Sequence, residues 1–195
     1  MSAAGRVCTG FSKPYVAKYA AAGGVVTYSE GMLLARGVSV DISPDSASDD
    51  NIFYADNVAA ETVGGTFTGG TVTLTVDGLL DAARRLVLGL PAAGADGFIA
   101  FGDDQNIPNV GIGFIARFMS NGVTTYVPVI LAKCRFNEPA ISAETQEEEI
   151  DWQTEELEAA ILRDDSANHV WKYLGEEQPT EAEAEAKIKT KFNIT

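Results

Sequence analysis

The sequence is poor in positive charge and in long apolar runs. Its 195 residues carry 14 Lys and Arg against 28 Asp and Glu, which gives a formal net charge of -14. Tight binding to nucleic acid or to an anionic membrane requires clustered Lys and Arg, so this composition argues against such a surface. No apolar run reaches the roughly 18 residues of a transmembrane helix. The first residues lack the apolar core of a signal peptide.

Cysteine and histidine are also scarce. Cys8 and Cys134 lie in separate apolar stretches, which favours buried or half-buried thiols over a disulfide framework. His169 is the only histidine, so a multi-histidine metal site is excluded and a Ser-His-Asp triad has one candidate base. Its place in a turn before a strand favours a structural or solvent-facing role. The pairs 103–104 and 164–165 lack a calcium loop's glycine and terminal glutamate, so we interpret them as solvated turn carboxylates.

One glycine motif lies in the wrong context for a cofactor. Residues 111–116 fit G-x-G-x-x-A, but a dinucleotide site needs that motif between a strand and a helix, and here it opens a hairpin. The run Glu147 to Glu149 is interpreted as a solvated cluster that limits edge pairing. We find no nucleophile beside a base, no metal ligand set and no phosphate loop. The sequence therefore predicts no enzymatic activity, no cofactor and no metal.

Alternating apolar and polar residues predict a mainly β, antiparallel fold, a β-sandwich or small barrel. Val38, Val40 and Ile42 share one face of a half-buried strand. Thr66 to Val76 alternates again, with Gly69-Gly70 as a bulge or turn. Residues 150–154 are a further candidate strand.

The Asn121-Gly122 pair lies between two apolar runs and predicts a two-residue type I′ hairpin turn. That turn pairs Phe114 with Val129 on an apolar face, which we expect in the core. The opposite face is mixed and is expected to meet another chain or another sheet. Its candidate contact residues are Ile115, Arg117, Tyr126 and Ile130.

Two helices are predicted. Leucines at helical spacing over 79–90 indicate a short flanking helix, with Asp77 as N-cap, Asp81 in the first turn and Gly89 at its end. At the C-terminus, Thr180 and Glu183 form a capping-box pattern that opens a helix over about 180–192. Few apolar residues lie in this second helix, so a surface position is expected.

The segment at about 43–65 is predicted to be a long acidic loop. It contains no Lys or Arg and carries an apolar centre. Long loops in compact domains are uncommon and often functional. The apolar centre either folds back on the chain's own core or docks on a neighbouring subunit. The candidate inter-subunit residues are Asp49, Asp50, Ile52, Phe53, Tyr54 and Asp56.

Five segments follow one another in a specific order. They are 31–38, 50–57, 79–89, 110–114 and 150–158, the last reading Ile-Asp-Trp-Gln-Thr-Glu-Glu-Leu-Glu, with Trp171 after it. In this order the chain resembles the major tail proteins, or tail tube proteins, of long-tailed, non-contractile bacteriophages. The resemblance is to the kind found in phages and prophages of Gram-positive bacteria.

The resemblance implies a structural virion protein, assembled in the host cytoplasm, with one tail tube domain over 1–195. Such proteins form hexameric rings that stack into a tube, and strands of neighbouring subunits line its lumen. DNA passes through that lumen without specific binding. The other implied partners are a tape-measure protein and tail tip and terminator proteins, with no membrane. Acidic charge would keep DNA from adhering, or it would only keep the free subunit soluble.

Two other classes stay open. One is a non-enzymatic β-sandwich that binds carbohydrate, as in an adsorption module, which would show exposed aromatic residues on a concave face and no self-assembly. The other is a hydrolase with a cryptic carboxylate pair, such as a glycosidase. Electron microscopy of the purified protein distinguishes these classes from a tube-forming protein.

Overall fold

The computed structural model describes residues 5–46, 51–55, 58–63, 66–102, 105–140 and 153–194. Most of these residues are in antiparallel strands, with two short helices. The strands are β1 (Val7–Ala22), β2 (Val25–Leu33), β3 (Gly37–Ser46), β4 (Asn51–Ala55), β5 (Val58–Val63), β6 (Phe67–Val76), β7 (Val110–Ser120), β8 (Val123–Phe136), β9 (Glu155–Leu162) and β10 (Lys172–Leu174), and the helices are α1 (Asp81–Leu88) and α2 (Glu181–Phe192).

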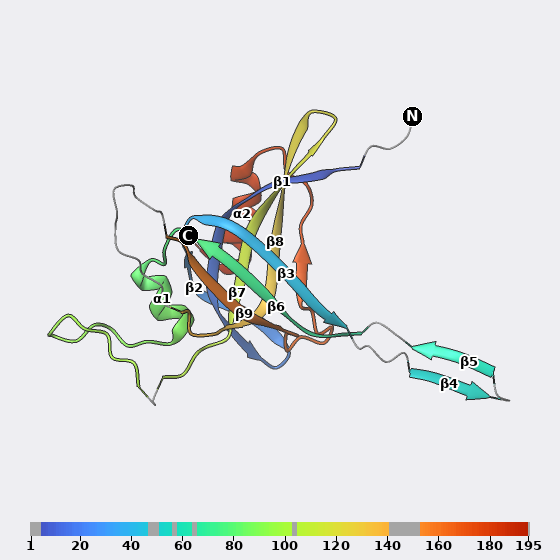
Figure 1. The fold of residues 1–195 in the computed structure, drawn as a ribbon, viewed down its shortest axis with the longest axis horizontal. Helices are drawn as coiled ribbons and strands as arrows, with labels where there is room; N and C mark the ends of the chain where they lie inside the picture. The colour runs from blue at the N-terminus through green and yellow to red at the C-terminus, as the bar shows by residue number, and fades with distance from the viewer. Residues whose placement is uncertain are drawn as a thin grey trace.

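Eight of the strands form one sheet in the order β2-β1-β7-β8-β9-β6-β3, with β10 paired to β8, while β4 and β5 pair only with each other (Figure 1). The predicted mainly β, antiparallel class is therefore confirmed. The main sheet is curled, so that the start of β3 lies close to β1 although the two strands are far apart in the sheet order. A Cβ on Gly37 would overlap the Phe11 ring, so only glycine permits this approach.

The main core fills the concave side of the curled sheet, and α1 closes one end of it. Alternate side chains of each strand point inward, as the two-residue period of a strand requires. Burial of each large side chain contributes about 1.5–3 kcal/mol. The inward residues include Val16, Val72, Leu74, Ile112, Phe114, Val127, Val129, Leu131, Leu157, Ala159 and Ile161, with Ala83, Val87 and Leu88 from α1.

Helix α2 covers part of the opposite face of the sheet, where it forms a second, smaller core. Ala184, Ile188 and Phe192 are completely buried there, while the other residues of the helix are partly or fully exposed, so the helix lies at the surface as expected and buries one face. The close fit explains the glycine motif of β7. A Cβ on Gly111 would lie 2.5 Å from the Tyr28 ring and one on Gly113 2.7 Å from Ile188, so the glycines make room for the helix.

The β7–β8 hairpin confirms the predicted turn and register. Asn121 and Gly122 have φ values of 50° and 78°, the left-handed conformations that a type I′ turn needs. Phe114 pairs with Val129 and Arg117 with Tyr126, as predicted. The capping box is also confirmed in part, because the Thr180 hydroxyl accepts a hydrogen bond from the Glu183 backbone N–H at 3.3 Å.

Several local expectations need correction. Val38 is 57% exposed, because a register shift between Gly37 and Ser39 places it in a bulge. Asp77 does not cap α1, since Leu80 holds the N-cap position without a side-chain bond. Asp77 instead accepts a hydrogen bond from the Arg36 backbone N–H at 3.0 Å and pairs with its guanidinium, which lowers the pKa of the carboxyl.

Two further segments differ from the sequence prediction. Gly69 and Gly70 lie inside β6, where a Cβ on Gly70 would come within 2.7 Å of the Ser43 carbonyl oxygen. The last strand before β10 is Glu155–Leu162, whereas residues 153–154 precede it and 150–152 lie outside the described residues. Its alternation of buried Leu157 and Ile161 with exposed glutamates is a strand signal that the sequence prediction missed.

Candidate assembly surfaces

The predicted loop at about 43–65 is largely a β-hairpin, which we call the arm (residues 43–65). β3 continues to Ser46, and β4 and β5 then pair with each other, with Phe53 opposite Glu61. Aromatic and β-branched residues around Phe53 favour strand over loop, and Pro44 is tolerated because β3 is an edge strand. In Figure 1 the β4–β5 hairpin extends away from the main sheet.

The candidate inter-subunit residues fall unevenly on this arm. Ile52, Phe53 and Tyr54 are in β4, so the backbone places them on the projecting hairpin. Asp49, Asp50 and Asp56 lie outside the described residues. The structure therefore brings the apolar candidates into one short strand and says nothing of these three carboxylates.

A bare polar face lies on the outer side of β3, β6 and β9, where α2 does not reach. Three rows cross these strands: Ser39–Thr75–Glu156, Asp41–Thr73–Glu158 and Ser43–Thr71–Ala160. Nearly every side chain in these rows is a hydroxyl or a carboxylate, and none is Lys or Arg. The nearest basic neighbour in register is Arg135 of β8, which pairs with Ala160. We call these nine residues the polar face.

The second face of the β7–β8 hairpin is covered by the chain's own helix. Ile115 is fully buried and Ile130 is 7% exposed, both packed with α2, so they are not free to contact another chain in this arrangement. This corrects the expectation that another chain or sheet covers that face. Arg117 is exposed and Tyr126 is partly buried at the rim. These two candidates remain accessible.

A partly buried carboxylate anchors α2 on β1. Glu185 pairs with Lys13 and accepts hydrogen bonds from the Tyr15 hydroxyl at 2.7 Å and from Lys189 Nζ at 2.8 Å. Lys13 reaches it from an irregularity in β1, where Lys13 has a φ of 51°. The hydrogen bond from Lys13, together with that from Lys189, lowers the pKa of Glu185 to about 2.

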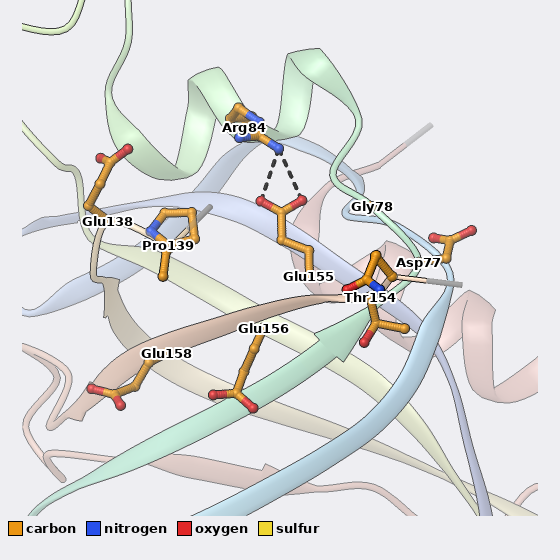
Figure 2. A pocket seen from close by; sticks show the side chains of 11 residues that line it. Asp77, Gly78, Arg84, Glu138, Pro139, Thr154, Glu155, Glu156 and Glu158 are labelled. Carbon is orange, nitrogen blue, oxygen red and sulfur yellow. Dashed lines mark hydrogen bonds and ion pairs between the residues drawn. The ribbon is translucent and has the colours of Figure 1, made fainter. Parts of the chain in front are cut away.

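A groove of about 650 Å³ lies between α1 and the start of β9 (Figure 2). Arg84 Nη2 donates to both Glu155 carboxylate oxygens at 2.9 and 3.0 Å. The Leu79 backbone N–H donates to Glu155 Oε2 at 3.0 Å. Glu155 thus holds the start of α1 against β9, and its carboxylate is already occupied by these donors.

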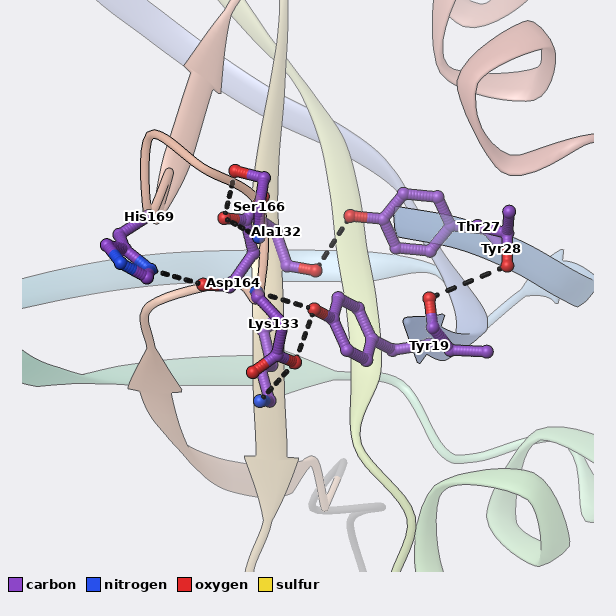
Figure 3. Close-up of polar contacts among 10 residues, drawn as sticks. Tyr19, Thr27, Tyr28, Ala132, Lys133, Asp164, Ser166 and His169 are labelled. Atoms are coloured by element: carbon purple, nitrogen blue, oxygen red, sulfur yellow. Dashed lines mark hydrogen bonds and ion pairs between the residues drawn. The ribbon is translucent and has the colours of Figure 1, made fainter. Parts of the chain in front are cut away.

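The turn after β9 contains Asp164, which is 1% exposed (Figure 3). The Ser166 hydroxyl donates to its Oδ1 at 2.6 Å, and the Tyr173 hydroxyl to its Oδ2 at 3.4 Å. His169 Nδ1 lies 3.2 Å from the Asp164 carbonyl oxygen. The serine proton is directed at the aspartate and the imidazole at the backbone, which differs from the serine–histidine–aspartate order of a catalytic triad.

The neighbouring Asp165 ties this turn to the sheet. Its Oδ2 accepts from the Tyr19 hydroxyl at 2.7 Å and from Lys133 Nζ at 2.8 Å (Figure 3). The bond from Lys133 lowers the pKa of Asp165, and burial raises the pKa of Tyr19 to about 12. Both aspartates therefore help to hold the turn: Asp164 is buried, which differs from the predicted solvated pair, whereas the Asp165 side chain stays 53% exposed. The other predicted pair, 103–104, and the run 147–149 lie outside the described residues.

No protein-family model and no curated protein matches the chain. Within the described ranges, no group of three His, Cys, Asp or Glu side chains is placed to hold a metal ion. No helix in the same ranges is long and apolar enough to cross a membrane.

Proposed function

We propose that this chain is a structural, non-enzymatic subunit of a phage tail tube. It assembles with copies of itself into hexameric rings that stack into a tube, and DNA is delivered through the lumen. Its location is the virion tail, built in the host cytoplasm, where it meets a tape-measure protein and tail tip and terminator proteins. The single observation that carries the proposal is the arm, because a hairpin outside the main sheet provides surface for another chain.

Open sheet edges support lateral assembly. β2 and β3 stand at the two ends of the sheet order, and each has a strand neighbour on one side only. Unpaired edges are templates for strands of another chain. Contact between different surfaces of identical subunits produces rings when the rotation closes. Joining β2 of one copy to β3 of the next would extend the sheet around a ring.

The polar face supports a role in DNA passage. Its carboxylates, Asp41, Glu156 and Glu158, are exposed and flanked by hydroxyls. A surface of this kind repels phosphates and offers no apolar contact to bases, so DNA slides past it without attachment. In the proposed tube, the polar face lines the lumen.

The arm is tested by removing its apolar centre. Deletion of Ile52 to Tyr54 is expected to leave a folded protein that forms no tubes, because the docking residues are gone and the main sheet is untouched. Circular dichroism checks the fold and negative-stain electron microscopy scores tubes. Val123→Ser, which alters an exposed valine at the β7–β8 turn, serves as a control that keeps tubes. Normal tubes from the deletion variant would refute the role of the arm.

The polar face is tested by charge reversal. Glu156→Lys with Glu158→Lys is expected to leave tubes intact, to let them retain DNA at low salt and to impair ejection in phage carrying the change. The control, Asp96→Lys with Glu176→Lys, makes the same change of net charge at exposed sites outside the polar face. If both variants retain DNA equally, overall charge and not the polar face governs the effect.

A carbohydrate-binding module is the second candidate, favoured by one observation. Phe98 and Phe101, in the segment between α1 and β7, are 76% and 52% exposed, and exposed aromatic rings can stack on sugars. Against it, the concave side of the sheet is filled by the main core. Single particles without rings, together with binding to cell-wall sugars that Phe98→Ala abolishes, would favour this candidate.

A further inference from the structure

The segment between α1 and β7 presents an aromatic ring to solvent. Phe98 is 76% exposed, which is the highest value among the exposed large apolar side chains of the described residues. In Figure 1 this segment extends outward from α1. An exposed ring forgoes the stabilisation that burial provides, so a partner surface that covers it gains that free energy.

A fixed turn holds this ring outward. The Gly94 backbone N–H donates to the Phe98 carbonyl oxygen at 2.8 Å, and the Gly97 N–H donates to the Gly94 carbonyl oxygen at 2.9 Å. The next residue, Ile99, packs against the main core and ties the turn to the body of the protein. We call residues 94–98 the phenylalanine turn. Because its backbone is already ordered, it loses little conformational freedom when its ring is bound.

An open groove of about 550 Å³ lies between α1 and the strands β1 and β2. Pockets that hold small ligands have volumes of about 300–1,000 Å³, so a phenylalanine ring fits into this space. Its apolar lining includes Met32, Leu86 and Pro108, each of which is only partly buried and is therefore open to a partner. We call this surface the α1 groove.

The rim of the α1 groove carries an excess of positive charge. Lys18 and Arg85 line it together with one carboxylate, Glu30, which pairs with Lys18 at 3.3 Å. The ion pairs formed among the described residues do not include Arg85. The face of an aromatic ring is negative and attracts a guanidinium that lies within about 6 Å of its centre. The rim therefore complements the charge distribution of the Phe98 ring, and the lining complements its apolar character.

The ring and the groove of one chain are separate surfaces. Phe98 is not among the residues that line the α1 groove of its own chain. The backbone bonds of the phenylalanine turn and the packing of Ile99 keep the ring at its exposed position. In this conformation, a ring that enters the groove comes from a second copy.

We propose that the Phe98 ring of one copy inserts into the α1 groove of a second copy. There it packs on Met32 and Leu86, and the Arg85 guanidinium lies against its face. Because the donor and acceptor surfaces differ, the contact is head-to-tail and propagates from copy to copy. The inference rests on the proposed self-assembly and names two surfaces that meet in it.

Disulfide trapping tests the contact in the full chain. In a Cys8→Ser background, Ala95→Cys in the phenylalanine turn is placed in one preparation and Ala82→Cys in the α1 groove in a second, and the two are mixed and mildly oxidised. Both positions are exposed, and both changes leave the Phe98 ring in place. A disulfide between the two chains, identified by mass spectrometry, is the expected result. Val123→Cys, which is 63% exposed in the native residue and lies outside the groove, replaces Ala82→Cys in the matched control and should give little product.

Removing the ring tests the same contact without a covalent bond. Phe98→Ser should raise the concentration needed for assembly by roughly tenfold or more, because truncation of an aromatic anchor weakens an interface strongly. Ala82→Trp should have a similar effect, because the new side chain obstructs the groove from an exposed position of α1. Phe101→Ser is the matched control, since it removes a ring that is 52% exposed in the same segment but outside the turn, and it should change that concentration by less than about threefold. Circular dichroism checks the fold of each variant, and sedimentation measures assembly.

The outcomes separate this contact from the tube itself. Cross-linked pairs without tubes in micrographs would support the contact and overturn the tail tube proposal. Tubes that form from Phe98→Ser at the wild-type concentration would overturn the contact alone, as would equal trapping at Val123→Cys. A disulfide formed within a single chain carrying both cysteines would also overturn it, because the occupant would then be the chain's own turn. Failed trapping, together with sugar binding that Phe98→Ser abolishes, would overturn it in favour of a carbohydrate as the partner of this ring.

Discussion

Replacing Glu185 with glutamine tests how α2 is held on the sheet. The Glu185 side chain is 14% exposed and is bound by Lys13, Tyr15 and Lys189. Its pKa falls from 4.5 to about 2. At 1.36 kcal/mol per pKa unit, this corresponds to an upper limit of about 3 kcal/mol of stabilisation of the charged form. Lys13 is 38% exposed, so solvent screening reduces the expected contribution to about 1–2 kcal/mol.

The sign of the pH dependence follows from the lowered pKa. Because the folded protein holds Glu185 charged at lower pH than the unfolded chain, the stabilisation is complete above about pH 4.5 and is lost as the pH falls toward 2. Glu185→Gln should therefore lower the free energy of unfolding by about 1–2 kcal/mol at pH 7. The difference from the wild type should shrink steadily below pH 4.5.

Urea denaturation followed by tryptophan fluorescence measures this difference at pH 7, 5 and 3, at a concentration where sedimentation shows one species. Glu183→Gln is the matched control, since Glu183 is an exposed glutamate in the same helix, and it should change stability by less than about 0.5 kcal/mol. A Glu185→Gln effect that is independent of pH, or equal to that of the control, would show that the carboxylate is not the anchor.

Three other changes have expected outcomes. Phe192→Ala should lower the free energy of unfolding by about 3–5 kcal/mol, because this side chain of α2 is fully buried against the sheet. The same urea titration measures the difference. Gly70→Ala should lower the free energy of unfolding by about 1–3 kcal/mol, because the new methyl group would lie 2.7 Å from the Ser43 carbonyl oxygen. An unchanged free energy of unfolding would mean that the backbone of β3 shifts at no cost. Glu155→Gln should loosen the start of α1, seen as faster amide exchange at Leu79, whose N–H it binds; unchanged exchange would argue against that role.

Local patterns determined the strands and turns of this protein. The β7–β8 register was predictable because a two-residue Asn-Gly turn fixes every pair that follows it. The C-terminal helix was predictable from its cap and its charges. The buried face of this helix could also have been predicted from the spacing of Ala184, Ile188 and Phe192, since residues four apart lie on one helix face.

Only the tertiary structure decided which residues share a surface. The polar face brings together residues from β3, β6 and β9, which are distant in the chain, and no local period relates them. Likewise, Gly111 and Gly113 match a cofactor motif in sequence, but their role is to admit α2, which comes from the other end of the chain. Composition and periodicity determine what each segment becomes, whereas the contacts between distant segments determine which face is core, which is free and which can meet another chain.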